Sequence, residues 1–313
     1  MPDGIFLCIE VTSMNIEEFQ FKDRIIKGIT ADGNFKISVV KTTDTIKEAT
    51  ERHELGLLAK VILGKAMTAT MLLASELKKE ERIQLRMDGK GPLGTVISEA
   101  NSLGEVRGYV GNPNAELDYT KPGVTLGDGI GVGVLSFTKI LYDKAEPRTS
   151  TIEIITGDVT ADVAHYLVQS EQVPSAVLLD VGIDEDGNLT NAGGLLLQRL
   201  PDAPEGQIDM LQERLGSFPP IDQLLSDGQY IDSIMETSVS PIKVKELTRQ
   251  PVDFFCRCSR ERFLDALSML NINDLKELEC ETQEIVCHYC NNKEEISKGE
   301  IATLISEAQA KLN

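Results

Sequence analysis

Four cysteines near the C-terminal end constrain the fold of this chain more than any other feature. Cys256 and Cys258 form a C-x-C pair, and Cys287 and Cys290 form a C-x-x-C pair after a gap of 28 residues. Residues two apart in an extended segment place both side chains on one face, and a tight turn brings the sulfurs of C-x-x-C to one point. Together the pairs predict a closed tetrahedral site of four sulfurs, which suits Zn²⁺ in a structural role.

The segment that carries these cysteines, residues 251–313, is too small to bury much apolar surface. We therefore expect a cross-link, such as a bound metal ion, to stabilise it. Metal binding would then supply folding energy for this unit. Ser259 is expected to cap one helix, and Ser297 with Glu300 has the spacing of a capping box at the start of another.

Three further residues are alternative ligands or thiols. Cys280 and His288 lie close enough in sequence to compete, but four thiolates already complete the shell. We therefore interpret Cys280 as a spare thiol and expect His288 to face solvent. Cys8, in the apolar run IFLCIE, is expected to be a buried core residue.

Zinc ligation keeps sulfurs deprotonated, and the thiolate is the form that oxidants attack. Oxidation of the cysteines would expel the metal and so remove the cross-link that stabilises this segment. Three arginines, Arg257, Arg260 and Arg262, either offset the negative charge of the site or form an ordinary solvated helix start, and both interpretations stay open.

Composition limits the classes of function. The chain has 313 residues, a net charge of −19 and six cysteines. Such a charge repels phosphate backbones and anionic lipid, which argues against nucleic-acid and membrane partners. We expect the N-terminal residues not to be a secretory signal, and we expect Leu55–Leu77 to be too short and too charged to span a bilayer. We therefore expect a soluble cytoplasmic protein, in which paired cysteines are metal ligands or redox switches.

The first 200 residues indicate a mixed α and β domain. Residues 35–43, FKISVVKTT, alternate like a strand, and residues 177–197 predict strand–turn–strand around Asp186-Gly187. A helix is predicted over Glu51–Leu77. Residues 201–250 differ, because five prolines separate short amphipathic pieces that are marginal in water and need a surface to lie on. Their predicted apolar faces contain Ile208, Leu211, Leu215, Ile221, Leu224, Leu225, Ile231 and Ile234.

Two other motifs are weak. GKGPLG, at Gly89, Gly91 and Gly94, matches a dinucleotide-binding fingerprint literally, but no helix follows it, so a turn is expected. DEDGN, at 184–188, begins like a calcium loop, but Leu195 stands where the loop needs glutamate, so a hairpin turn is expected. We assemble no catalytic constellation from the histidines and predict no enzymatic activity.

Four stretches together resemble one family, the redox-regulated zinc chaperones called heat-shock protein 33. They are GKGPLG followed by GEVRGYVGNP, GDVTADVAHYLVQSEQVPSAV, NAGGLLLQRLP at 191–201, and the two cysteine pairs. The resemblance covers essentially the whole chain, and the combination is highly specific.

The resemblance implies an α+β fold with three parts. These are an N-terminal core domain over residues 1–200, a metastable helical linker over 201–250 and a zinc-binding redox-switch domain over 251–313. It implies an ATP-independent holdase that is inactive when reduced and zinc-bound. On oxidation, zinc leaves, the linker unfolds, unfolding client proteins bind, and a homodimer forms.

The resemblance also assigns residues. One zinc ion per chain is expected on Cys256, Cys258, Cys287 and Cys290, with disulfides Cys256–Cys258 and Cys287–Cys290 in the oxidised form. The chain departs from the family pattern in the extra Cys280 and in Glu294, which stands near the place of an aromatic residue.

Two alternatives remain at this point. A zinc ribbon that binds nucleic acid is disfavoured because residues 251–313 carry 12 acidic and 7 basic side chains, a net charge of 7 − 12 = −5. An enzyme with a merely structural zinc ion is the other alternative.

Overall fold

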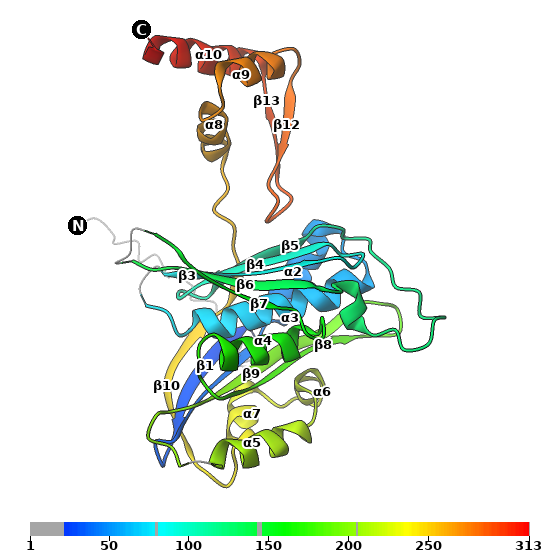
Figure 1. Ribbon diagram of the computed structural model, residues 1–313, viewed down its shortest axis with the longest axis vertical. Coiled ribbons are helices and arrows are strands. Elements are labelled where there is room, and N and C mark those ends of the chain that lie inside the picture. The colour runs from blue at the N-terminus through cyan, green and yellow to red at the C-terminus, as the bar shows by residue number, and fades with distance from the viewer. Residues whose placement is uncertain (1–21, 79–80, 143–145, 205, 313) are drawn as a thin grey trace, which may run out of the picture.

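The computed structural model describes residues 22–78, 81–142, 146–204 and 206–312. Two sheets stack with helices between them, and a small unit projects from the second sheet (Figure 1). The first sheet is antiparallel, in the order β10 (Val244–Pro251), β1 (Arg24–Thr30), β2 (Phe35–Lys41), β9 (Leu189–Arg199), β8 (Ser175–Ile183). The second runs β11 (Asp253–Phe254), β5 (Glu105–Val110), β4 (Thr95–Asn101), β3 (Arg82–Gly89), β6 (Gly133–Ile140), β7 (Arg148–Glu153). This arrangement confirms the mixed fold class, with the predicted strand–turn–strand present as the β8–β9 hairpin.

The layer between the sheets holds α2 (Thr43–His53), α3 (Leu57–Ala74) and α4 (Val159–Gln169). The single helix predicted over Glu51–Leu77 is wrong, because the chain breaks between α2 and α3. Glu54 adopts a left-handed conformation with φ of 49°, and Gly56 is extended and begins α3. The break turns α3 so that it runs between the two sheets.

Helix α3 is the centre of the core. By length and composition it qualifies as a membrane span, so the expectation that this stretch is too short and too charged was wrong. It is nevertheless 72% buried inside the protein, between the two sheets. Small buried residues of the helix, such as Ala59, Ala66 and Ala69, let neighbouring elements approach it. The pattern is that of a core helix, apolar all round.

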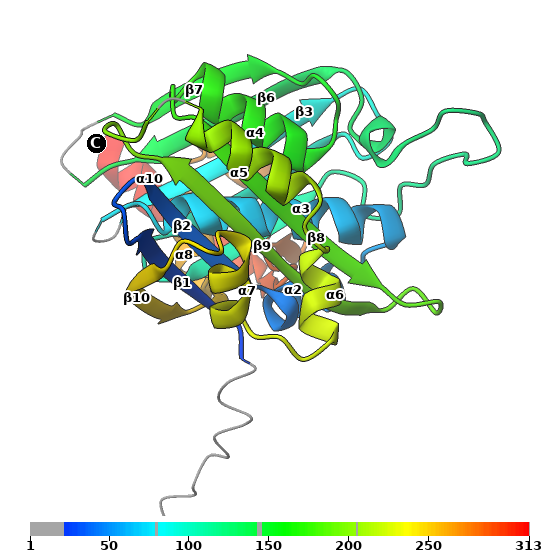
Figure 2. The same cartoon turned by 90° about the horizontal axis from the view of Figure 1, so that it is seen from below.

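A further layer covers the outer face of the first sheet (Figure 2). It consists of α5 (Gln207–Gly216), α6 (Ile221–Ser226) and α7 (Ile231–Ser238). The apolar faces predicted for this segment are confirmed as buried, and they pack on Ile26, Phe35, Ile37, Val39, Leu195 and Leu197 of the sheet. The helical prediction fails at the end of the segment, where β10 joins the sheet beside β1.

The three covering helices lack the local bonds that usually start a helix. Their N-cap positions are Gly206, Pro220 and Tyr230, and none makes a side-chain cap hydrogen bond. Helix α6 takes its cap from the sheet instead, because Asp180 Oδ2 on β8 accepts from the Ile221 N–H at 2.8 Å. The helices therefore depend on the sheet beneath them, as their short length requires.

The two glycine-containing motifs form turns, as predicted. GKGPLG links β3 to β4, where the Gly94 N–H donates to Gly91 O. A Cβ on Gly91 would lie 2.5 Å from Asp128 O, so the turn needs glycine for close packing against the 3-10 turn η1 (Leu126–Gly129). In the β8–β9 hairpin, Asp184 Oδ1 accepts from the Asp186 and Asn188 N–H groups.

The projecting unit contains α8 (Arg260–Ser268), α9 (Ile272–Leu278), the hairpin of β12 (Gln283–Val286) and β13 (Lys293–Ile296), and α10 (Lys298–Leu312). Among the described residues, its small buried apolar core consists of Leu267, Leu275, Ile296, Ile301 and Ile305. Ser259 caps α8, and Ser297 with Glu300 forms the predicted capping box.

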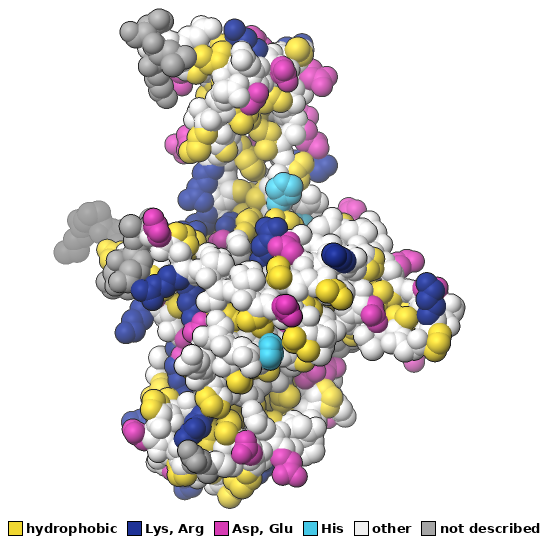
Figure 3. Space-filling model, viewed as in Figure 1, with side chains coloured by type: hydrophobic (Ala, Val, Ile, Leu, Met, Phe, Trp, Pro, Cys, Tyr) yellow, Lys and Arg dark blue, Asp and Glu magenta, His cyan; other side chains and the backbone are white. Residues whose placement is uncertain are grey.

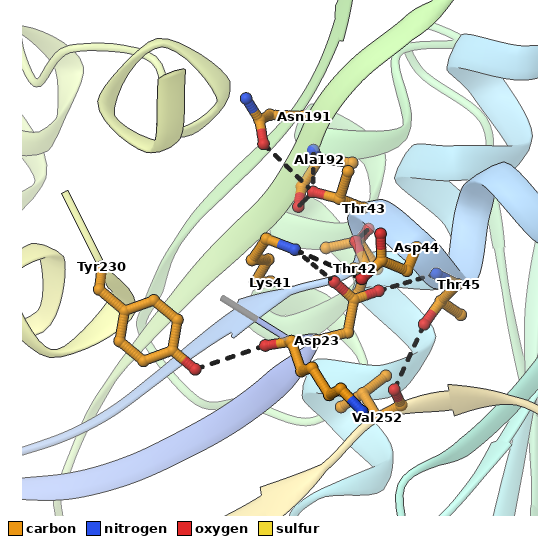
Figure 4. Close-up of polar contacts among 12 residues, drawn as sticks. Asp23, Lys41, Thr42, Thr43, Asp44, Thr45, Asn191, Ala192, Tyr230 and Val252 are labelled. Atoms are coloured by element: carbon orange, nitrogen blue, oxygen red, sulfur yellow. Dashed lines mark hydrogen bonds and ion pairs between the residues drawn. The ribbon is translucent and has the colours of Figure 1, made fainter. Parts of the chain in front are cut away.

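A buried ion pair joins the parts of the fold near the start of β1 (Figure 4). Asp23 accepts from Lys41 Nζ at 2.8 Å and from the Thr45 N–H of α2 at 2.8 Å. The Asp23 carbonyl oxygen accepts a hydrogen bond from the Val252 N–H, just after β10. The Lys22 carbonyl oxygen accepts one from the Tyr230 hydroxyl, at the start of α7. The first sheet, α2 and the covering segment are thus tied at one point.

Substitution of Asp23 by asparagine should strongly destabilise the core. Removing one partner of a buried pair leaves the Lys41 ammonium uncompensated, which costs about 3–5 kcal/mol. Asp44, whose carboxylate lies 3.9 Å from the same ammonium but is 66% exposed, supplies the control. Asp44→Asn should cost less than about 1 kcal/mol. Urea unfolding measures both, and equal losses would contradict the importance of the buried pair.

Candidate metal centre

Two separate pieces of chain bring the four paired cysteines together. Cys256 and Cys258 follow β11 as the chain leaves the second sheet, and Cys287 and Cys290 lie in the tight turn between β12 and β13. In that turn the Asn291 N–H donates to Cys287 O at 2.8 Å, and Asn291 is left-handed with φ of 57°. The extended C-x-C and the turned C-x-x-C face each other.

The sulfur geometry suits a metal ion. The four Sγ atoms lie within 4.8 Å of one another, with Cys256–Cys287 at 3.7 Å and Cys258–Cys290 at 3.3 Å. Four sulfurs around one zinc ion at ~2.3 Å in a tetrahedron stand about 3.8 Å apart. A disulfide would instead need a distance of ~2.05 Å, and all four cysteines are free thiols.

The surroundings of the four sulfurs affect the pKa of each thiol differently. Burial raises the pKa of the Cys258 and Cys290 thiols. Burial acts the same way on Cys256, but hydrogen bonds from the Cys258 N–H and the Arg107 guanidinium hold the pKa of Cys256 below its usual value. A divalent cation bound among the four sulfurs would favour the thiolate at each of them.

The C-x-x-C turn lies directly on the core. Tyr289, inside the motif, receives a hydrogen bond from Gln84 Nε2 at its hydroxyl and one from His53 at its carbonyl oxygen. The Arg107 guanidinium on β5 lies 4.0 Å from the centre of the Tyr289 ring and donates to Cys256 Sγ at 3.3 Å. Arg107 therefore contacts both pieces of the cysteine cluster.

The remaining candidates lie outside the cluster. Cys280 is exposed in the turn after α9, and His288 is exposed with its ring 5.7 Å from that of Tyr109. Cys8 lies outside the described residues. Arg260 pairs with Glu294 and Glu300 and Arg257 pairs with Glu105, so neither bonds to a sulfur there.

Sequence reasoning missed Arg107, which does contact the cluster. It lies about 150 positions before Cys256, within GEVRGYVGNP, and only the pairing of β11 with β5 brings the two together. In the sequence, Arg107 is only a charged residue in a strand-like stretch. Many surface strands contain such a residue, so the pattern alone could not assign Arg107 to the cysteine cluster.

Comparison with known proteins agrees with this architecture. The family model described as Hsp33 protein matches residues 23–297. A protein named 33 kDa chaperonin from Desulforamulus reducens is 37% identical and aligns over 93% of this chain and 99% of its own length. One with the same name from Carboxydothermus hydrogenoformans is 40% identical over 89% of this chain and 96% of its own.

A solved structure is also similar. The crystal structure of the 33 kDa chaperonin, a heat shock protein 33 homologue, from Thermotoga maritima superposes with a TM-score of 0.84 at 29% identity. The match covers 92% of this chain and 99% of that one. These likenesses define the class as a molecular chaperone. The chain belongs to the Hsp33 family.

One metal ion per chain is expected in the reduced protein. Loss of a residue that only hydrogen-bonds to a metal ligand weakens metal binding by ~10–100-fold. Cys287→Ser removes a direct ligand, so it should weaken metal binding by more than that. Cys280→Ser should leave binding unchanged, since that thiol is exposed and apart from the cluster. Elemental analysis and competition with a chelator measure both, and equal losses would show that the ligand set is different.

Proposed function

We propose that this chain is a redox-regulated, ATP-independent holdase that binds one Zn²⁺ through Cys256, Cys258, Cys287 and Cys290 and is inactive in that state. The proposal rests mainly on the short connection between two weakly stabilised parts, the segment that covers the first sheet and the cysteine-bearing unit. Strand β10, the end of the covering segment, finishes at Pro251, only five positions before Cys256. A change in the metal unit therefore acts at once on the segment that covers the first sheet.

Bound zinc would supply a closed tetrahedral cross-link between the C-x-C and C-x-x-C segments. The projecting unit needs such a link because its own apolar core has five buried residues. Oxidation by a peroxide would convert two thiolates to one disulfide, with two electrons and two protons reducing the peroxide to water. Two disulfides leave no thiolate to hold the cation.

The covering helices would then lose their support. Helices α5–α7 have no cap bonds from their own N-cap side chains and lie on apolar side chains of β1, β2 and β9. When they leave, their apolar faces and the sheet face beneath become exposed together. Contiguous apolar surface of this kind is what an unfolding protein binds, and the activity requires no catalytic residue.

The proposal extends to the domain division and the partners. We assign residues 1–200 to the chaperone core, 201–250 to the metastable linker and 251–313 to the redox switch, with β10 as the linker strand that joins the core sheet. The partners are unfolded or partly unfolded proteins, and oxidised chains pair as homodimers. The bacterial cytoplasm, as a reducing compartment, suits the resting thiol form.

Oxidation should link cysteines within each motif rather than across the cluster. In the folded unit the shorter sulfur distances run across, from Cys256 to Cys287 and from Cys258 to Cys290. Once the unit opens, motif neighbours stay close while the cross pairs are separated by about 30 residues, and closing that longer loop costs entropy. Peptide mapping after peroxide treatment should find Cys256–Cys258 and Cys287–Cys290. A dominant bridge to Cys280 would contradict this pairing.

A charge on the buried face of the linker should activate the reduced protein. Leu224 on α6 is buried against the sheet, so Leu224→Glu should undock the linker while the four thiolates still hold zinc. Gln223, its exposed neighbour, supplies the control, because Gln223→Glu adds the same charge without burying it. Under reducing conditions only Leu224→Glu should suppress aggregation of a thermally unfolding client.

Hydrogen exchange and zinc content complete this test. Leu224→Glu should exchange faster across 201–250 and keep one zinc per chain, whereas Gln223→Glu should match the parent protein. A zinc-loaded Leu224→Glu protein that stays inactive with an undocked linker would contradict the proposed role of the linker.

A further inference from the structure

A small hollow lies where the projecting unit meets the second sheet. It has a volume of about 100 Å³, and its charged lining consists of Arg82, Arg107, Arg257, Arg262, Glu99 and Glu105. Figure 3 shows Lys and Arg side chains gathered on the neck between the upper unit and the sheets. In a chain with a net charge of −19, this concentration of positive charge runs against the character of the whole surface.

The arginines of the hollow are not neutralised by its acids. Four guanidinium groups face two carboxylates, which leaves a charge of 4 − 2 = +2. Arg107 pairs with Glu99 at 2.8 Å and Arg257 with Glu105 at 2.9 Å. Arg82 lies 3.8 Å from Glu99, beyond hydrogen-bond distance. The Arg262 side chain makes no ion pair with any residue in the described part of the chain.

The cysteine cluster does not account for these charges. Of the four guanidinium groups, Arg107 alone donates to a cysteine sulfur. Arg82 and Arg262 are directed neither at a sulfur nor at a carboxylate within hydrogen-bond distance in the described structure. A guanidinium group presents a planar fork of N–H donors that matches two oxygens of one anion. Two incompletely paired forks beside one small hollow are the lining that a tetrahedral oxyanion requires.

The four arginines come from both sides of the junction. Arg82 on β3 and Arg107 on β5 belong to the second sheet, whereas Arg257 lies between the C-x-C cysteines and Arg262 is on α8. We propose that this hollow binds one doubly charged oxyanion of the phosphate class and that the anion bridges the metal-binding unit to the core sheet. The chemistry is shared by the free ion and by the terminal group of a phosphomonoester.

A bridging anion would stabilise the closed arrangement, because a ligand that binds only the folded junction shifts the equilibrium toward it. The proposed site adjoins the cysteine cluster through Arg107 and Arg257, but it uses no sulfur as a ligand and no residue of the linker. Anion binding to the reduced protein therefore does not depend on the holdase proposal, and either can fail without the other.

Calorimetric titration of the full-length, reduced, metal-loaded protein with inorganic phosphate tests binding, with ionic strength held constant by sodium chloride. We expect one saturable site. Arg262→Gln and Arg82→Gln should each weaken it about tenfold, through loss of a charge-assisted bond from opposite sides of the junction. Arg148→Gln, on β7 at the other edge of the same sheet, is the matched control and should bind like the parent.

The bridge has its own readout. Saturating phosphate should slow hydrogen exchange over 251–263 in the parent and in Arg148→Gln, but not in Arg262→Gln. Competition by a nucleoside monophosphate would extend the ligand to phosphomonoesters, and failure to compete would restrict it to the free ion; both outcomes support the site. Absence of saturable binding, or equal weakening by Arg148→Gln, would overturn the site. Binding without slower exchange would overturn the bridge.

Discussion

The rest of this structure depends on the crowding of four sulfurs within 4.8 Å of one another in a unit with only a small apolar core. Burial raises the pKa of the Cys258 and Cys290 thiols, and a cation bound among the four sulfurs would favour the thiolate at each of them. The proposed function uses the same closeness, because thiolates are the form that oxidants attack and neighbouring sulfurs can then join as disulfides. In the proposed function, this one cluster joins the stability of a domain to its redox state.

The first sheet explains how a local event can spread. Its inner face packs on α3 in a large permanent core, and its outer face packs on three short helices whose own N-cap side chains do not cap them. Of the two layers, the outer one has less local support, because its helices are short and have no side-chain cap bonds. The weaker layer is continuous in sequence with the cysteine-bearing unit, and the proposed function requires that loss of the metal weaken this layer.

Electrostatics at the junction adds a second kind of link. The Arg107 guanidinium contacts Cys256, Glu99 and Tyr289. One positive charge therefore lies where the second sheet meets the cysteine-bearing unit. The neighbouring Arg82 and Arg262 leave positive charge unused in an otherwise acidic protein. The junction is therefore held by polar contacts and charge, which respond to solution ions, in addition to the packing of the cysteines against the main apolar core.

The sequence alone determined the features that depend on local pattern. The spacing of four cysteines indicated one closed site, the Ser297–Glu300 spacing indicated a helix start, and the apolar positions of 201–250 indicated docked helices. Tertiary structure decided what depends on distant segments meeting. The break at Glu54, the strand β10, the Asp180 cap of α6 and the Arg107 contact all follow from packing between residues far apart in sequence, and local propensity carries no record of such neighbours.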